Sequence, residues 1–177
     1  MYLLKIKMEQ VSYLDQLIAN CEAAKKAVCV KKINLNKGID IPDTLSAIYI
    51  IKEKNGNAQI TFDQFKKFKD DQVQKKKRNK NKNNEEKEVV LACPKINSPS
   101  EILYVGSSTT GLKARLYQHT THSHNATYAL RLNEWFSGNY EIEIRVYEET
   151  NEVLQLIEDD LSFNLKPAFG KRGSNNK

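Results

Sequence analysis

The sequence lacks any apolar run approaching the roughly 20 residues that a membrane-spanning helix needs. Its first ten residues carry Lys5, Lys7 and Glu9, where a signal peptide would have an unbroken apolar segment. We therefore expect a cytoplasmic protein with no membrane partner.

Cysteine is also scarce. The three cysteines, Cys21, Cys29 and Cys93, are odd in number and have no CxxC spacing, which supports neither a disulfide framework nor a zinc site. His122 and His124 lie close together, but without cysteines at zinc-finger spacing they are better explained as part of a loop.

The composition is that of a folded domain with a basic surface. Apolar residues make up 40% of the 177 residues and charged residues 28%, which suits one buried core and leaves no room for a second full domain. The net charge of +6 favours approach to a polyanion such as DNA, RNA or an acidic membrane. Charge alone does not choose among these partners.

Apolar spacing predicts both helices and strands along the chain. We expect helices over 11–28 (with Ser12 as the N-cap), 60–73, 112–120, 126–136 and 152–163. We expect strands over 28–33, 47–51, 101–105 and 140–147. From residue 47 onward this order is typical of a small sheet flanked by helices.

A polar run interrupts this pattern. Residues 75–84 are all lysine, arginine or asparagine, and three glutamates follow within four positions. A segment this polar cannot bury enough surface to offset its ordering entropy, so we predict a mobile loop. A DNA-contacting element and a merely solvated loop explain its charge equally well. Its candidate DNA-binding residues are Lys75, Lys76, Lys77 and Arg78.

Two tyrosines stand in apolar strands, Tyr49 in Ala-Ile-Tyr-Ile-Ile and Tyr104 in Ile-Leu-Tyr-Val-Gly. Alone, each would be read as a core aromatic. On the helix expected over 112–120, Arg115 and His119 share one face with two leucines, which holds both side chains near the interior. An arginine and a histidine one turn apart, beside a Gly-Ser-Ser-Thr-Thr turn, also describe an anion site.

The last expected helix supplies a carboxylate. Its apolar stripe includes Leu154, Ile157 and Leu161, and Glu158 falls at the edge of that stripe. A glutamate in this position is most often an ordinary boundary residue. On the preceding helix, Trp135 is expected to fill the core and has no catalytic role.

Taken in order, these residues resemble the GIY-YIG nucleases. Ala47-Ile48-Tyr49 resembles the first signature triad, with Ala in place of Gly, and Tyr104-Val105-Gly106 resembles the second, with Val in place of Ile. The segment 112–116 resembles the arginine-bearing helix of the family, and His119 falls where restriction-type members place a histidine. The segment 156–167 resembles the closing helix, with a proline nine positions after Glu158.

The resemblance implies the GIY-YIG nuclease fold, an α/β (α+β) architecture in which helices flank a small, central, mainly antiparallel three-stranded sheet. It implies three parts of the chain: an N-terminal helix and strand extension (1–46) packed on the core, a catalytic domain (47–170) and a basic C-terminal tail (171–177). Tyr49 and Tyr104 are 55 positions apart, whereas the family usually joins its triads by a tight hairpin. The catalytic domain therefore contains a basic insertion at about 54–99.

Two positions depart from the family pattern. The lysine that usually follows the second triad is Ser107 here, and the terminal asparagine of the motif is replaced by Gly170. Asn164 is a candidate substitute for that asparagine, although a weak one.

The resemblance also implies a metal-dependent DNA endonuclease, of restriction type or of another biological role. It makes Glu158 the sole protein ligand of Mg²⁺ or Mn²⁺ and Arg115 the clamp on the scissile phosphate. Tyr49 would position or deprotonate the attacking water, and Tyr104 would orient Tyr49 or the phosphate. Positive charge beside Tyr49 would come from the metal, from Arg115 or from His119.

Ser107 and Lys113 are further candidate DNA contacts, and no organic cofactor is expected. A homodimer would let one active site serve each strand. Two alternatives stay open: a structure-selective or single-strand nuclease of repair or mobile DNA, and a nucleic-acid-binding module that has lost catalysis.

Overall fold

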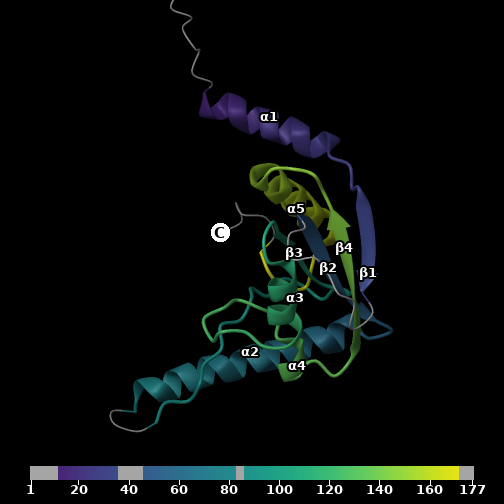
Figure 1. The fold of residues 1–177 in the computed structure, drawn as a ribbon. Helices are drawn as coiled ribbons and strands as arrows, with labels where there is room; N and C mark the ends of the chain where they lie inside the picture. Colours follow the sequence, from purple (N-terminus) through teal and green to yellow (C-terminus); the bar gives the residue numbers. More distant parts are fainter. Residues whose placement is uncertain (1–11, 36–45, 83–85, 172–177) are drawn as a thin grey trace, which may run out of the picture.

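The fold is organised around a four-stranded antiparallel sheet with the strand order β1-β4-β2-β3 (Figure 1). The structure is a computed structural model that describes residues 12–35, 46–82 and 86–171. The strands are β1 (Lys31–Leu35), β2 (Ala47–Lys54), β3 (Ile102–Ser108) and β4 (Asn139–Val146). The mixed α/β architecture is confirmed, but the expected count of three strands was wrong. The strand of the N-terminal extension pairs along the whole of β1 with β4 and so joins the sheet as its fourth member.

Five helices surround this sheet within the described residues: α1 (Tyr13–Lys26), α2 (Ala58–Lys80), α3 (Leu112–Thr120), α4 (Leu132–Trp135) and α5 (Asn151–Leu165). The bounds of α3 are those predicted. Ser12 caps α1 as expected, because its side chain accepts a hydrogen bond from the backbone N–H of Asp15.

Both faces of the central strand β2 are buried. Along β2, Ala47, Tyr49 and Ile51 face one hydrophobic cluster, while Ile48 and Ile50 face another, as the two-residue period of a strand requires. Residues of α2, α3 and α4 complete the first cluster, and residues of α1 and α5 complete the second. The sheet is therefore the middle of three layers (Figure 1).

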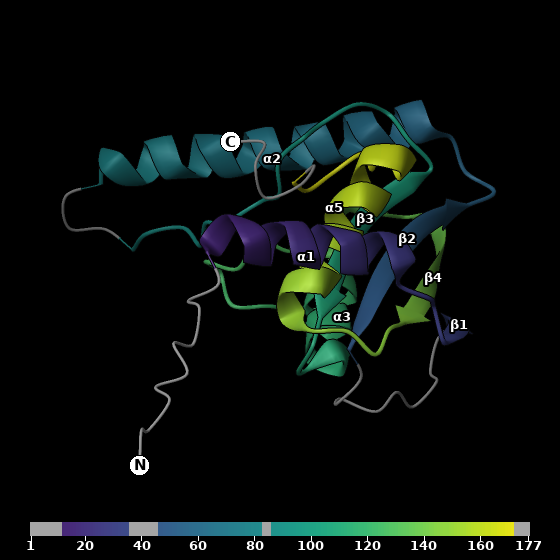
Figure 2. The same cartoon turned by 90° about the horizontal axis from the view of Figure 1, so that it is seen from above.

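The predicted mobile loop was wrong for residues 75–80. Helix α2 continues through the lysine-rich run to Lys80, past the end expected at residue 73, and projects well beyond the sheet (Figure 2). Lysine, glutamine and arginine are good helix formers, so this run extends a helix that is already anchored. Its far end is fastened to Glu88: Arg78 donates two hydrogen bonds of 2.9 and 2.7 Å to the carboxylate, and Asn79 exchanges two with the backbone.

The first half of α2 provides the anchor. Phe65 is fully buried, and Phe62 and Phe68 pack partly buried against the same cluster. The ring centroid of Phe65 lies 4.2 Å from that of Phe169 and 4.9 Å from that of Trp135. The core position expected for Trp135 is thus confirmed, and part of the insertion belongs to the core of the domain.

The predicted helix over 126–136 was also wrong, since only its last turn, α4, is helical. The break lies at Arg131, a buried residue whose φ of +53° is in the left-handed region and cannot continue a right-handed helix. Its guanidinium donates hydrogen bonds to backbone carbonyls within 123–127, which hold the preceding chain in an irregular path. The segment is therefore a loop, as proposed for the region of His122 and His124.

Among the described residues, no helix is long and apolar enough to cross a membrane. Residues 1–11 and 36–45 of the N-terminal extension lie outside the described residues, and so do 83–85 of the basic run and 172–177 of the predicted basic tail.

Candidate active site

The pairing of β2 with β3 brings the two signature tyrosines together. Tyr49 lies opposite Gly106, and Ile51 lies opposite Tyr104, so both phenol rings stand on the same face as diagonal neighbours. Their ring centroids are 6.2 Å apart with an interplanar angle of 11°. A shift of register between Ile51 and Lys52 ends the regular pairing just beyond Tyr104.

Two glycines make room for these rings. A Cβ atom on Gly106 would lie 2.5 Å from Oη of Tyr49, closer than any side chain tolerates. A Cβ on Gly170 would lie 2.8 Å from the ring of Tyr104, and Gly170 has a φ of +102°, which favours glycine. The packing of Tyr104 therefore requires a glycine at position 170, where the resemblance predicts an asparagine.

Another asparagine, missed by the sequence reading, braces this end of the chain. Asn97 donates side-chain hydrogen bonds of 3.0 and 3.2 Å to the carbonyls of Pro167 and Gly170. Asn164, the candidate substitute, is exposed near the end of α5. Asn97 belongs to the insertion, where neither periodicity nor a motif marks it.

His119 lies fully buried between the tyrosines, with its ring centroid 4.3 Å from that of Tyr104 and 5.5 Å from that of Tyr49. The backbone N–H of Leu130 donates to Nδ1 at 3.2 Å, so the proton of the neutral ring is on Nε2. Nε2 therefore donates to Oη of Tyr49, at 3.1 Å.

Burial, with a further contribution from the charge of Arg115, lowers the pKa of His119 to about 3. The imidazole is therefore neutral at pH 7. The expectation that His119 could supply positive charge to Tyr49 is therefore wrong. A site that is buried away from water and lies near a guanidinium disfavours a second cation.

Tyr49 is sealed from solvent. Burial raises the pKa of its phenol well above the ordinary value, and the charges of Tyr104 and Glu158 raise it further. Arg115 opposes these effects through its charge and through a side-chain hydrogen bond to Tyr49. Among the described residues, Arg115 is therefore the cation whose charge favours ionisation of the Tyr49 phenol.

Arg115 itself lies half-buried on α3, on the face that also carries the buried Leu112 and Leu116, as the sequence predicted. Its Nη1 donates to Oε1 of Gln118 at 2.7 Å. The same helix carries Lys113, which is exposed.

Glu158 reaches the cluster from α5, a helix capped by the side chain of Thr150. Ser107, which stands where the resemblance predicts a lysine, donates a short hydrogen bond from Oγ to Oε2 of Glu158. Gln155 donates to the same oxygen at 3.4 Å. Ser107 was expected to contact DNA; here its hydroxyl orients the carboxylate, a contact over 51 positions that no local pattern could reveal.

Burial raises the pKa of Glu158, and the hydrogen bond from Ser107 and the charge of Arg115 oppose that rise. The charge of Glu158 in turn raises the pKa of both Tyr49 and Tyr104. The predicted catalytic residues therefore form one electrostatically connected cluster. The four candidate DNA contacts of the basic run lie elsewhere, on the second half of α2.

The cluster offers a metal ion a single carboxylate. Within the described ranges, no group of three or more histidine, cysteine, aspartate or glutamate residues could hold a metal. Mg²⁺ commonly binds one or two carboxylates and retains several waters, so Glu158 fits this mode of binding. A zinc site built from protein ligands alone is not supported by these residues.

No family model, curated protein or solved structure matches this chain.

Proposed function

We propose that this protein is a metal-dependent DNA endonuclease of the GIY-YIG type that hydrolyses phosphodiester bonds. The observation that carries the proposal is that side chains from four separate elements form one cluster of two phenols, an imidazole, a guanidinium and a carboxylate. They are Tyr49, Tyr104, His119, Arg115 and Glu158. A fold needs no such grouping for its stability, since burial of an ionisable carboxylate and a guanidinium is costly.

Glu158 would hold Mg²⁺ or Mn²⁺ through Oε1, because Ser107 and Gln155 both donate to Oε2. When bound, the ion would polarise the phosphate and stabilise the departing 3′ oxygen. Metal binding favours the ionised carboxylate, so it would be weakened at low pH by the raised pKa of Glu158.

Arg115 would bind the scissile phosphate, since a guanidinium matches the geometry of phosphate oxygens. Its present partners are Gln118 and Tyr49. While Arg115 holds the phosphate, its charge would still oppose the rise in the pKa of the neighbouring Tyr49 phenol, which would orient the attacking water or accept its proton. His119 acts as a positioning residue, because its Nε2–H bond to Oη fixes the phenol and stabilises the phenolate.

Plasmid nicking with Mg²⁺ tests the proposal. We expect Glu158→Gln and Arg115→Lys to reduce the rate by roughly a hundredfold or more, the size typical of losing one preorganised electrostatic group. Asp160→Asn is the matched control, because Asp160 is an exposed carboxylate on the same helix and its loss should leave the rate unchanged. Wild-type nicking by a folded Glu158→Gln protein would overturn the assignment.

One observation favours the second candidate function, a nucleic-acid-binding module without catalysis. Tyr49 is fully buried and its pKa is raised, neither of which suits a base that must meet water. Turnover separates the two functions: a nuclease converts excess plasmid with added metal, whereas a binding module only retards it on a gel.

A further inference from the structure

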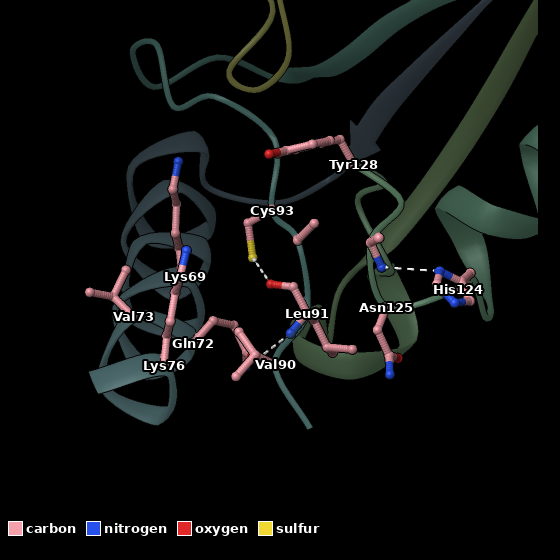
Figure 3. Close-up of a pocket in the computed structure, with 12 residues that line it drawn as sticks. Lys69, Gln72, Val73, Lys76, Val90, Leu91, Cys93, His124, Asn125 and Tyr128 are labelled. Carbon is pink, nitrogen blue, oxygen red and sulfur yellow. Dashed lines mark hydrogen bonds between the residues drawn. The ribbon is translucent and has the colours of Figure 1, made fainter. Parts of the chain in front are cut away.

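A hollow of about 520 Å³ opens between α2 and the loop that precedes Arg131 (Figure 3). Its volume is within the range of about 300–1,000 Å³ found for small-molecule sites. Val73 and Val90 provide apolar wall, while Lys76 of α2 and Tyr128 of the loop stand on either side (Figure 3). None of the five residues of the candidate active site lines it.

The side chains around this hollow suit a nucleotide. The side chain of Tyr128 is 68% exposed and that of Val73 is 45% exposed, so an aromatic ring and an aliphatic surface are both open to a ligand. Aromatic rings beside lysines are the usual means by which proteins bind single-stranded nucleic acid, because every base can stack and every phosphate is anionic. Lys76 and Asn125 are exposed and lie at the same hollow, where they can meet a phosphate and a base edge.

Both walls are held in place before any ligand binds. On the loop side, the buried guanidinium of Arg131 donates to the carbonyls of Ser123, His124, Asn125 and Thr127. On the α2 side, the buried side chain of Gln72 accepts a 3.0 Å hydrogen bond from the backbone N–H of Leu91. A preformed site binds its ligand without a large ordering cost.

A second hollow lies beside α3, which carries two residues of the candidate active site. It has a volume of about 540 Å³, is lined by Gln118 and Tyr117 of α3, and shares His124 with the first. Gln118 accepts the 2.7 Å hydrogen bond from Arg115. A strand held by Arg115 would follow these lining residues, from Gln118 to His124, to reach Tyr128.

From this arrangement we propose that the hollow beside Tyr128 binds an unpaired nucleotide of the DNA strand that the active site cuts. The inference deepens the proposed nuclease function and rests on it. A base in a duplex is stacked and paired, so it cannot enter a pocket without being extruded. The protein should therefore prefer DNA with a single-stranded tail or branch, which favours the structure-selective form of the proposed nuclease.

Binding measured without divalent metal tests this inference. Fluorescence anisotropy compares a labelled blunt duplex with the same duplex carrying a short oligothymidine tail. The wild-type protein should bind the tailed DNA more tightly. Tyr128→Ala should weaken binding of the tailed DNA roughly tenfold and leave the blunt duplex unaffected, because stacking on one aromatic ring is lost.

Two further variants distinguish the loss of base stacking on Tyr128 from a general effect of substituting a tyrosine. Tyr128→Phe should keep the tail preference, because the ring remains. Tyr13→Ala should also keep it, since Tyr13 is 80% exposed on α1, which packs on the other face of the sheet. Photocrosslinking of a tail that contains 5-iodouracil should modify the peptide that includes Tyr128.

Equal binding of the tailed and blunt DNA by the wild-type protein would overturn the inference, and so would an unchanged tail preference in Tyr128→Ala or a crosslink confined to other peptides. These outcomes are independent of catalysis, because no metal is present. If only this inference fails, metal-dependent plasmid nicking by the wild-type protein persists. If only the nuclease proposal fails, the tail preference persists without nicking.

Discussion

The cluster around Tyr49 and the outer half of α2 differ in how their side chains are held. In the cluster, Tyr49 and His119 are fully buried, and directed hydrogen bonds fix the histidine and Glu158. On α2, Lys76 and Lys77 are exposed. The first region depends on burial and geometry, so changes there should alter stability and its response to pH. These two lysines contribute charge alone, so changing them should alter only the response to salt.

The largest effect should come from Arg131, the buried arginine that holds the loop over 123–127. Arg131→Ala leaves several loop carbonyls without their donor, and we expect it to lower the free energy of unfolding by roughly 3 kcal/mol. Urea denaturation measures this loss. Arg78→Ala is the control, because Arg78 is exposed and its salt bridge to Glu88 lies at the surface. Equal losses in the two variants would show that the loop does not depend on Arg131.

An effect of intermediate size should appear in the pH dependence of stability. At about pH 5 the unfolded chain protonates His119, whose ordinary pKa is 6.5, whereas the folded protein keeps it neutral until about pH 3. The unfolded state then binds more protons, so the stability supported by His119 is complete above about pH 6.5 and is lost as the pH falls. At about pH 5 this loss amounts to roughly 2 kcal/mol.

The variant His119→Gln removes this titration. Urea denaturation at about pH 7.5 and about pH 5 should give a smaller acid-induced loss for His119→Gln than for the wild-type protein. The comparison of two differences cancels the other groups that titrate in this interval. Parallel losses in the two proteins would contradict the burial of a neutral imidazole.

The smallest effect on stability should come from α2. The double variant Lys76→Gln/Lys77→Gln should unfold like the wild-type protein, because both side chains are exposed. Its affinity for DNA should depend less on salt, with the logarithmic slope reduced by about 0.9 for each lysine that contacts a phosphate. Lys25→Gln/Lys26→Gln on α1 removes the same charge and should leave the slope unchanged. Equal slopes in all three proteins would remove α2 from the DNA surface.

Local patterns were sufficient to locate the elements that carry the candidate site. The apolar face of α3 placed Arg115 and His119 beside the core, and the short apolar runs of β2 and β3 placed both tyrosines on buried strands. These features repeat over a few residues, so a sequence displays them directly.

The predictions that were wrong, and the contacts that were missed, depend on interactions between distant parts of the chain. The basic run was predicted as a loop from its composition, but Phe65 anchors α2 in the core and the helix propagates from there. The helix predicted over 126–136 is interrupted at a single buried residue, Arg131, whose side chain binds carbonyls of the preceding loop. The hydrogen bonds from Ser107 to Glu158 and from Leu130 to His119 form only in the folded chain, and no repeating pattern in the sequence marks them.

The return arm of the insertion forms part of the support for Tyr104. Ile96 pairs with Phe169 in an isolated β-bridge, the carbonyl of Lys95 accepts a hydrogen bond from the backbone N–H of Gly170, and Asn97 holds two carbonyls of the same segment. That segment packs against the ring of Tyr104. An engineer who shortened the chain by linking β2 directly to β3 would therefore lose a partner of the carboxyl-terminal segment along with the extra length.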